Sequence, residues 1–146
     1  MKNTWKRILA GSLALMLIAA ITPVFAAASE NKSSSDNKEA VEEIEWDGPV
    51  LTAWAGTVMG PSGKETYYNL DMSGIVQIMR GMGNTDEYWI REDGCKMLGD
   101  YIMCAANLDV HPRGSLVQSS LGMCIVCDTG GFAAYNPTQL DIATNW

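Results

Sequence analysis

Short apolar runs separated by glycine-rich turns make up most of the chain after residue 46. Six of these runs have the length and the β-branched or aromatic content of strands. They cover residues 50–55, 66–68, 101–106, 115–118, 123–127 and 139–143. The pattern predicts a mainly β domain, and strands this short favour a small closed barrel.

One stretch of the chain has helical rather than strand periodicity. Four apolar residues fall on one helical face: Ile75, Ile78, Met79 and Met82. Ser73 precedes this stretch and Gly83 follows it, as expected for the two ends of a short helix. Residues 56–64 contain three glycines and a proline and are interpreted as a loop.

The first 26 residues have the three parts of a secretory signal peptide. Lys2, Lys6 and Arg7 are followed by an almost wholly apolar stretch over residues 8–24. Small residues then offer cleavage sites after Ala26 or Ala28. An uncleaved membrane anchor is the alternative, but Pro23, just before the small residues, favours cleavage. The mature protein is therefore expected outside the cell, with no stable membrane insertion.

Residues 27–45 are expected to form a disordered linker. From Ser29 to Glu45 the sequence is SENKSSSDNKEAVEEIE, without an aromatic residue. Such a segment cannot bury enough apolar surface to become ordered. The folded domain is expected to span residues 46–146.

Charge excludes some classes of partner. The chain of 146 residues has 10 Lys and Arg against 17 Asp and Glu, a formal charge of −7. Without a basic run, binding to nucleic acid or to anionic lipid is not expected. His111 is the single histidine, so histidine-rich metal sites are excluded.

Four cysteines raise the question of disulfides in an exported protein: Cys95, Cys104, Cys124 and Cys127. Cys124 and Cys127 are three apart in a strand, so they point to opposite faces and cannot bond to each other. No second closely spaced pair completes a zinc site. The favoured interpretation is that these cysteines are small buried apolar residues, and disulfides are the alternative.

Two aspartates near the C-terminus are the main candidates for chemistry. Asp128 ends an apolar strand and is followed by Thr129-Gly130-Gly131, while Asp141 lies between Leu140 and Ile142. The glycines would let a ring-shaped substrate approach the backbone. Two neighbouring carboxylates are one way to raise the pKa of one of them. An Asx turn at Asp128 together with a solvent-exposed Asp141 explains the pattern equally well.

The Asp-Thr-Gly sequence also occurs in aspartic proteases. The retroviral type needs a long flap segment and an apolar-apolar-glycine stretch after the motif. Only 16 residues follow Gly130, and none of them matches. A protease is therefore excluded.

The same residues resemble the 3D (three-aspartate) domain of exported cell-wall proteins from Gram-positive bacteria. The match is carried by Asp128-Thr129-Gly130-Gly131 and Leu140-Asp141-Ile142, and by weaker similarity at residues 106–115 and 51–54. When the chain is aligned with the family pattern without gaps, the family's first aspartate matches Asn107. A two-residue shift of the alignment matches it to Asp109 instead. The segment 71–100 has no counterpart and is interpreted as an insertion. The resemblance implies a six-stranded double-psi β-barrel like that of membrane-bound lytic transglycosylase A, with a short helical insertion.

The resemblance also implies an activity. Lytic transglycosylases cleave the β-1,4 bond between N-acetylmuramic acid and N-acetylglucosamine in peptidoglycan, giving a 1,6-anhydro product. Asp141 matches the catalytic aspartate and Asp128 would support it, with neither metal nor organic cofactor. The expected protein is a monomer that acts on glycan strands at the cell wall. The alternative is a non-catalytic glycan-binding or expansin-like module.

Substrate-binding residues follow in part from the resemblance and in part from residue type. The candidates are Gly130, Gly131, Asn107, Asp109 and Tyr135. Four further aromatic residues could stack on sugar rings or fill the core: Trp54, Tyr67, Tyr68 and Trp89. Arg113 could contact a substrate carboxylate, and His111 is expected to be structural.

The signal-peptide prediction has a direct test. N-terminal sequencing of the secreted protein should return Ala27 or Ser29, because the small residues at 24–28 suit signal peptidase. A sequence that starts at Met1 would contradict the prediction.

Overall fold

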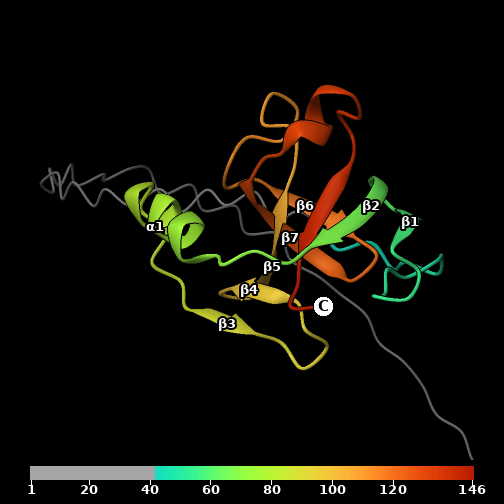
Figure 1. The fold of residues 1–146 in the computed structure, drawn as a ribbon, viewed down its shortest axis with the longest axis horizontal. Helices are drawn as coiled ribbons and strands as arrows, with labels where there is room; N and C mark the ends of the chain where they lie inside the picture. The colour runs from blue at the N-terminus through green and yellow to red at the C-terminus, as the bar shows by residue number, and fades with distance from the viewer. Residues whose placement is uncertain (1–41) are drawn as a thin grey trace, which may run out of the picture. The chain divides into compact units, whose positions relative to one another are not determined.

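Eight strands of the described region, residues 42–146 of the computed structural model, pair into one mixed sheet (Figure 1). One α-helix and one 3₁₀ helix accompany them. The strands are β1 (Thr57–Gly60), β2 (Gly63–Tyr68), β3 (Tyr88–Ile90), β4 (Lys96–Leu98), β5 (Tyr101–Ala105), β6 (Leu116–Ser119), β7 (Gly122–Asp128) and β8 (Leu140–Ala143). Helix α1 (Ser73–Gly81) lies between β2 and β3 in the chain, and η1 (Gly131–Ala134) lies between β7 and β8.

Strand β5 is the centre of the sheet. On one side it runs parallel to β7, which in turn pairs with β6. On its other side its first residues pair with β4 and its last residues pair antiparallel with β8. Strand β8 runs parallel to β2, and β1 closes a hairpin with β2. The order places the C-terminal end of β5 between β7 and β8.

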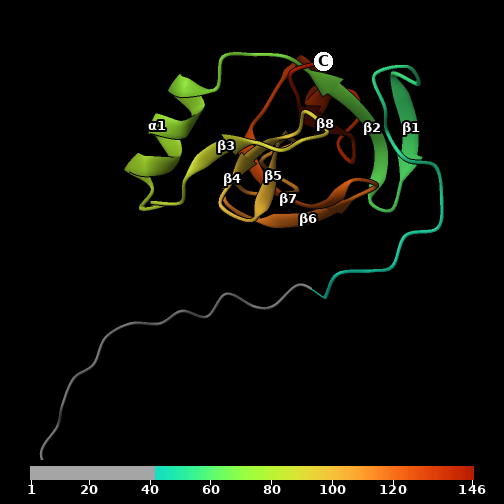
Figure 2. The ribbon, with the colours of Figure 1, turned by 90° about the horizontal axis from the view of Figure 1, so that it is seen from below.

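Apolar residues on the two faces of the sheet form two separate cores. One of them includes Ile102, Cys104, Val126, Leu140 and Ile142. The other lies beneath α1, where Met79 of the helix belongs to one cluster with Leu98, Met103 and Ile125. Figures 1 and 2 both show α1 beside β3. Burial on both faces explains why the central strands are continuously apolar rather than alternating.

A buried carboxylate joins strand β2 to the turn between β6 and β7. Glu65 is 0% exposed, and its two oxygens accept hydrogen bonds from the Ser120 backbone N–H at 2.8 Å and the Ser120 hydroxyl at 2.5 Å. The Ser120 hydroxyl also accepts a bond from the Leu51 N–H at 3.0 Å. A Cβ at Gly60 would lie 1.8 Å from the Glu65 carboxylate. Glycine at position 60 therefore leaves room for the Glu65 carboxylate.

The predictions of a mainly β fold and of one short helix are confirmed. Five of the six predicted strands are present, as β2, β5, β6, β7 and β8. The predicted strand at 50–55 is wrong: Thr52 accepts hydrogen bonds from the N–H groups of Ala55 and Gly56, which makes a turn. Trp54 is consequently 98% exposed.

The predicted loop at 56–64 is also wrong, because it contains β1 and the start of β2. Pro61 and Ser62 form the turn between these strands, and the glycines around it made the segment resemble a loop. Strands β3 and β4 in the segment 71–100 were not predicted either. The sheet therefore has eight strands rather than six, and it is open: within residues 42–146 no strand pairing joins β1 to β6.

The predicted signal peptide and most of the predicted linker lie outside the described residues. Residues 42–45, the described end of that linker, have no helix or strand. No helix within residues 42–146 has the length and hydropathy needed to cross a membrane. All four cysteines are free and buried, which confirms the favoured interpretation of them.

The buried position of Glu65 predicts a specific pH dependence of stability. Burial raises its pKa above the ordinary 4.5, against the lowering effect of the Ser120 bonds. The folded state therefore holds the proton more tightly than the unfolded state, and the contribution of Glu65 falls as pH rises from 4.5 through the raised pKa. When urea titrations are compared between pH 4 and pH 8, the free energy of unfolding should fall less with rising pH for Glu65→Gln than for wild type. Equal losses in the two proteins would contradict this origin.

Candidate functional site

Asp128 and Asp141 lie on the two strands that flank the end of strand β5. Ala105 is the register partner of Asp128 on β7 and also of Asp141 on β8. Two strand spacings put the aspartate Cα atoms about 10 Å apart. Both side chains are partly exposed. The sheet therefore brings together the two aspartates that the sequence singled out.

Asp141 is held by a short chain of polar side chains on neighbouring strands. The Thr66 hydroxyl donates a hydrogen bond to Asp141 Oδ1 at 2.6 Å, and Gln139 Nε2 donates to the same hydroxyl at 3.0 Å. Burial raises the pKa of Asp141, and the Thr66 bond opposes this rise only in part. Asp141 thus keeps its proton to a higher pH than an ordinary aspartate, as a general acid requires.

Asp128 has a different environment. No donor among the described residues forms a hydrogen bond with its carboxylate, whereas its backbone oxygen accepts one from the Ala106 N–H at 3.0 Å. Arg113, a candidate for contact with a substrate carboxylate, instead donates to the backbone oxygen of Cys127. The guanidinium therefore fixes the end of β7, and the Asp128 carboxylate is left for solvent or ligand.

The hydroxyl of Tyr68 is the polar group beside the two aspartates that sequence reasoning did not assign. It is buried and has no hydrogen-bond partner in the part of the chain that the structure describes. Burial raises the pKa of Tyr68 well above its usual value, and the nearby charges of Asp128 and Asp141 raise it further. Tyr68 was considered for stacking on sugar, but its ring packs against the core beneath α1. The raised pKa keeps this hydroxyl protonated near both carboxylates.

The two glycines after Asp128 differ in function. Gly130 has extended backbone, and a Cβ there would lie 3.0 Å from the Phe132 ring, so this glycine makes room for Phe132. Gly131 begins η1, and a Cβ at this position would meet no other atom within 4 Å. The exposed backbone at Gly131 is thus the surface that a ligand can approach.

Asn107 and Asp109 lie in the loop after β5, beside η1. The Asn107 amide donates to the Ala133 oxygen at 3.0 Å and accepts from the Asp109 N–H at 2.9 Å. Asn107 therefore holds this loop against η1 with both ends of its side chain. Asp109 is exposed and lines a depression of about 270 Å³ with Asn107, Leu108, Thr129, Ala133 and Ala134. Asp109 can therefore meet a ligand in this depression, whereas Asp128 is not among the residues that line it.

Tyr135 lies in the loop that follows η1 and is 86% exposed. Its ring is available for stacking on a ligand. Thr66 and Gln139 were missed because neither has a functional pattern in the sequence. The contact of Thr66 with Asp141 and with Gln139 depends on the parallel register of β2 with β8, in which Thr66 pairs with Asp141.

No group of three or more His, Cys, Asp or Glu side chains within residues 42–146 is arranged to hold a metal ion. Comparison of the chain with protein-family models, with curated proteins and with solved structures gave no match.

The hydrogen bond to Thr66 predicts how the Asp141 pKa responds to substitution. Thr66→Val keeps the side-chain shape but removes the donor that stabilises the carboxylate, so the Asp141 pKa should rise further. Carboxyl ¹³C chemical shifts followed through a pH titration measure it directly. Thr57→Val is the matched control, because the Thr57 hydroxyl bonds to the Glu65 backbone oxygen instead. An unchanged or lower Asp141 pKa in Thr66→Val would rule out this account.

Proposed function

We propose that this protein is an exported lytic transglycosylase that cleaves peptidoglycan with Asp141 as its acid and base. The proposal rests chiefly on Asp141, a half-buried carboxyl group with a raised pKa. Asp141 on β8 pairs with Ala105 of β5, and Asp128 on β7 pairs with the same residue from the other side. The resemblance of residues 101–143 to the 3D domain supplies the substrate class, and the signal-peptide pattern supplies the location at the cell wall.

The reaction needs only one group that both gives and accepts a proton. Protonated Asp141 donates its proton to the glycosidic oxygen as the bond to the muramoyl C1 breaks. The resulting carboxylate then takes the proton from the muramoyl C6 hydroxyl as that oxygen bonds to C1. The 1,6-anhydro sugar forms without water, and Asp141 is protonated again at the end. This differs from glycosidases that use two carboxylates on opposite sides of the bond.

The neighbours of Asp141 have separate tasks in this mechanism. Thr66 orients the carboxyl group through its 2.6 Å bond. In this proposal Asp128, whose carboxylate accepts no hydrogen bond from the described residues, binds sugar hydroxyls. Tyr135 and the exposed backbone at Gly131 contribute to glycan binding.

The double-psi β-barrel is part of the same proposal. Without β3, β4 and α1, six strands remain in the order β6-β7-β5-β8-β2-β1. The two ends of this series approach each other through polar contacts. The Ser62 hydroxyl donates to the Gln118 backbone oxygen at 2.7 Å, and Ser120 bonds to Glu65. These contacts support a barrel closed partly by side chains.

A non-catalytic glycan-binding module is the second candidate. It is favoured by the exposure of Trp54 and Tyr135, at 98% and 86%. Both candidates bind glycan strands, but only the enzyme releases anhydro-muropeptides.

The catalytic proposal predicts that Asp141→Asn abolishes cleavage. The amide keeps the size of the side chain but cannot transfer the proton, so activity should fall by at least about 10²-fold. Purified protein is incubated with peptidoglycan, and anhydro-muropeptides are measured by mass spectrometry. Asp128→Asn should also lower the rate, because the amide has only one oxygen left to accept hydrogen bonds from sugar hydroxyls.

Asp47→Asn is the matched control, because Asp47 is an exposed aspartate outside the site. It should retain wild-type activity. Wild-type protein that binds glycan but gives no anhydro product at any pH would refute the catalytic proposal and leave the binding module.

A further inference from the structure

Strand β3 forms one edge of the sheet. Among the described residues it pairs only with β4. Its three residues are Tyr88, Trp89 and Ile90, so the strand contains no charge, proline or glycine. Residues of those kinds usually protect an edge strand from pairing with another chain. Trp89 and Ile90 are also 41% and 48% exposed. Strand β3 is therefore an apolar edge without the usual protection.

Two residues of β3 have backbone groups that point away from β4. The Gly99 N–H donates to the Glu87 oxygen at 2.8 Å, and the Arg91 N–H makes the corresponding bond at the other end of the strand. Hydrogen-bonded positions alternate with non-bonded ones along an antiparallel pair, so residues 87, 89 and 91 face β4. The N–H and C=O groups of Tyr88 and Ile90 therefore lie along the free edge.

The two residues that flank β3 carry opposite charges. Glu87 precedes the strand and Arg91 follows it. When a second copy lies antiparallel with Trp89 opposite itself, Glu87 comes opposite the partner's Arg91. In the same register the outward backbone groups of Tyr88 face those of the partner's Ile90. A register centred on Tyr88 or Ile90 would not place the two charges opposite each other. The edge is therefore complementary to itself in both hydrogen bonds and charge.

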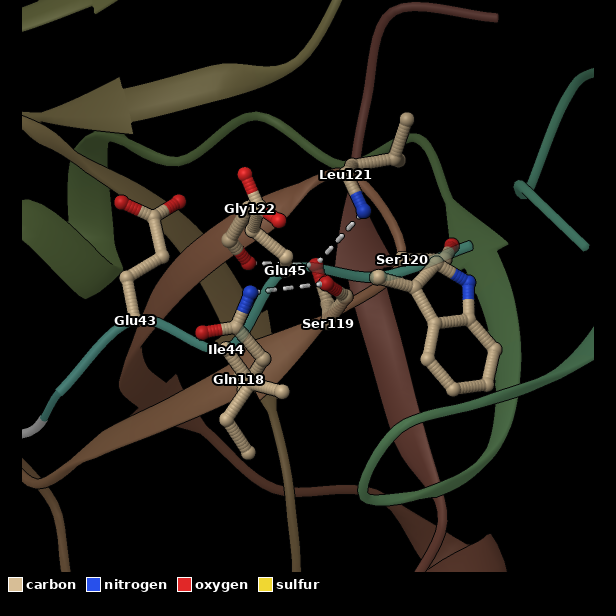
Figure 3. Close-up of a pocket in the computed structure, with 9 residues that line it drawn as sticks. Glu43, Ile44, Glu45, Gln118, Ser119, Ser120, Leu121 and Gly122 are labelled. Atoms are coloured by element: carbon tan, nitrogen blue, oxygen red, sulfur yellow. Dashed lines mark hydrogen bonds between the residues drawn. The ribbon is translucent and has the colours of Figure 1, made fainter. Parts of the chain in front are cut away.

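Arg91 is held in position and keeps a donor for a partner. Its Nε and Nη2 atoms donate to the Asp93 carboxylate at 3.0 and 2.6 Å, and Nη2 also donates to the Leu121 oxygen at 3.2 Å. Leu121 lies in the β6–β7 turn, beside a pocket of about 400 Å³ (Figure 3), where the Ser119 hydroxyl bonds to the Leu121 N–H and the Gly122 oxygen. Arg91 Nη1 donates to none of the described residues, so it is available to a further carboxylate.

We propose that β3 pairs antiparallel with β3 of a second copy, in a two-fold symmetric dimer centred on Trp89. Backbone hydrogen bonds join Tyr88 to the partner's Ile90, and Glu87 forms an ion pair with the partner's Arg91. Because both copies use the same edge, the pairing closes at two subunits. A strand of three residues buries little surface, so the dimer is weak and the expected monomer is its dilute form. The pairing uses no residue of the proposed mechanism.

Sedimentation equilibrium of the purified protein tests the proposal from about 1 µM to 1 mM, a range that covers weak association. The mass should rise toward that of a dimer and no further. Hydrogen exchange followed by NMR should show the amides of Tyr88 and Ile90 protected only at high concentration. The amides of Trp89 and Arg91, which bond to β4, should be protected at every concentration. A monomer over the whole range would overturn the proposal.

Variants separate edge pairing from non-specific association. Glu87→Lys places a cation opposite the partner's Arg91 at two symmetric points, so the dissociation constant should rise at least about tenfold. Asp47→Lys is the matched control, because it makes the same charge change at an exposed position outside β3. Ile90→Pro removes an outward N–H at an edge position that tolerates proline and should abolish the dimer, with circular dichroism as the check on folding. Equal effects of Glu87→Lys and Asp47→Lys would overturn the proposal.

Cysteine substitution tests the register. With oxidised glutathione, Trp89→Cys should form a disulfide-linked dimer, because non-hydrogen-bonded partners have Cα atoms about 4.5 Å apart. Ile90→Cys is the matched control, since position 90 faces the partner's Tyr88 rather than itself. The native cysteines are buried. Equal linking of the two variants, or preferential linking of Ile90→Cys, would overturn the proposal.

Discussion

The buried bonds between Glu65 and Ser120 are the interaction on which the arrangement of the sheet depends. They join β2 to the β6–β7 turn, 55 residues further along the chain. A carboxylate without these partners would lose far more on burial than it could gain from packing. Two further positions depend on these bonds. Glycine at position 60 leaves room for the Glu65 carboxylate, and the Leu51 N–H bonds to the same serine hydroxyl.

Successive residues of β2 serve opposite faces of the sheet, and this places the candidate site. Glu65 points toward Ser120, and Thr66, on the other face, bonds to Asp141. Tyr68, two residues further, lies on the same face as Thr66 and has its hydroxyl near both aspartates. Because side chains alternate along a strand, the buried position of Glu65 orients Thr66 toward Asp141. The residue with the buried carboxylate and the residue that bonds to Asp141 are thus adjacent in the chain.

Local sequence determined the short helix, five strands and the two aspartates, because apolar periodicity and glycine turns act over a few neighbouring positions. It failed at residues 50–64, where glycines made a hairpin resemble a loop and a turn at Thr52 replaced a strand. The partners of Asp141 and Glu65 were decided by tertiary structure alone. Thr66 meets Asp141 from 75 residues away, and only the parallel pairing of β2 with β8 brings them into register. The burial that raises the pKa of Asp141 likewise arises only when distant strands pack together.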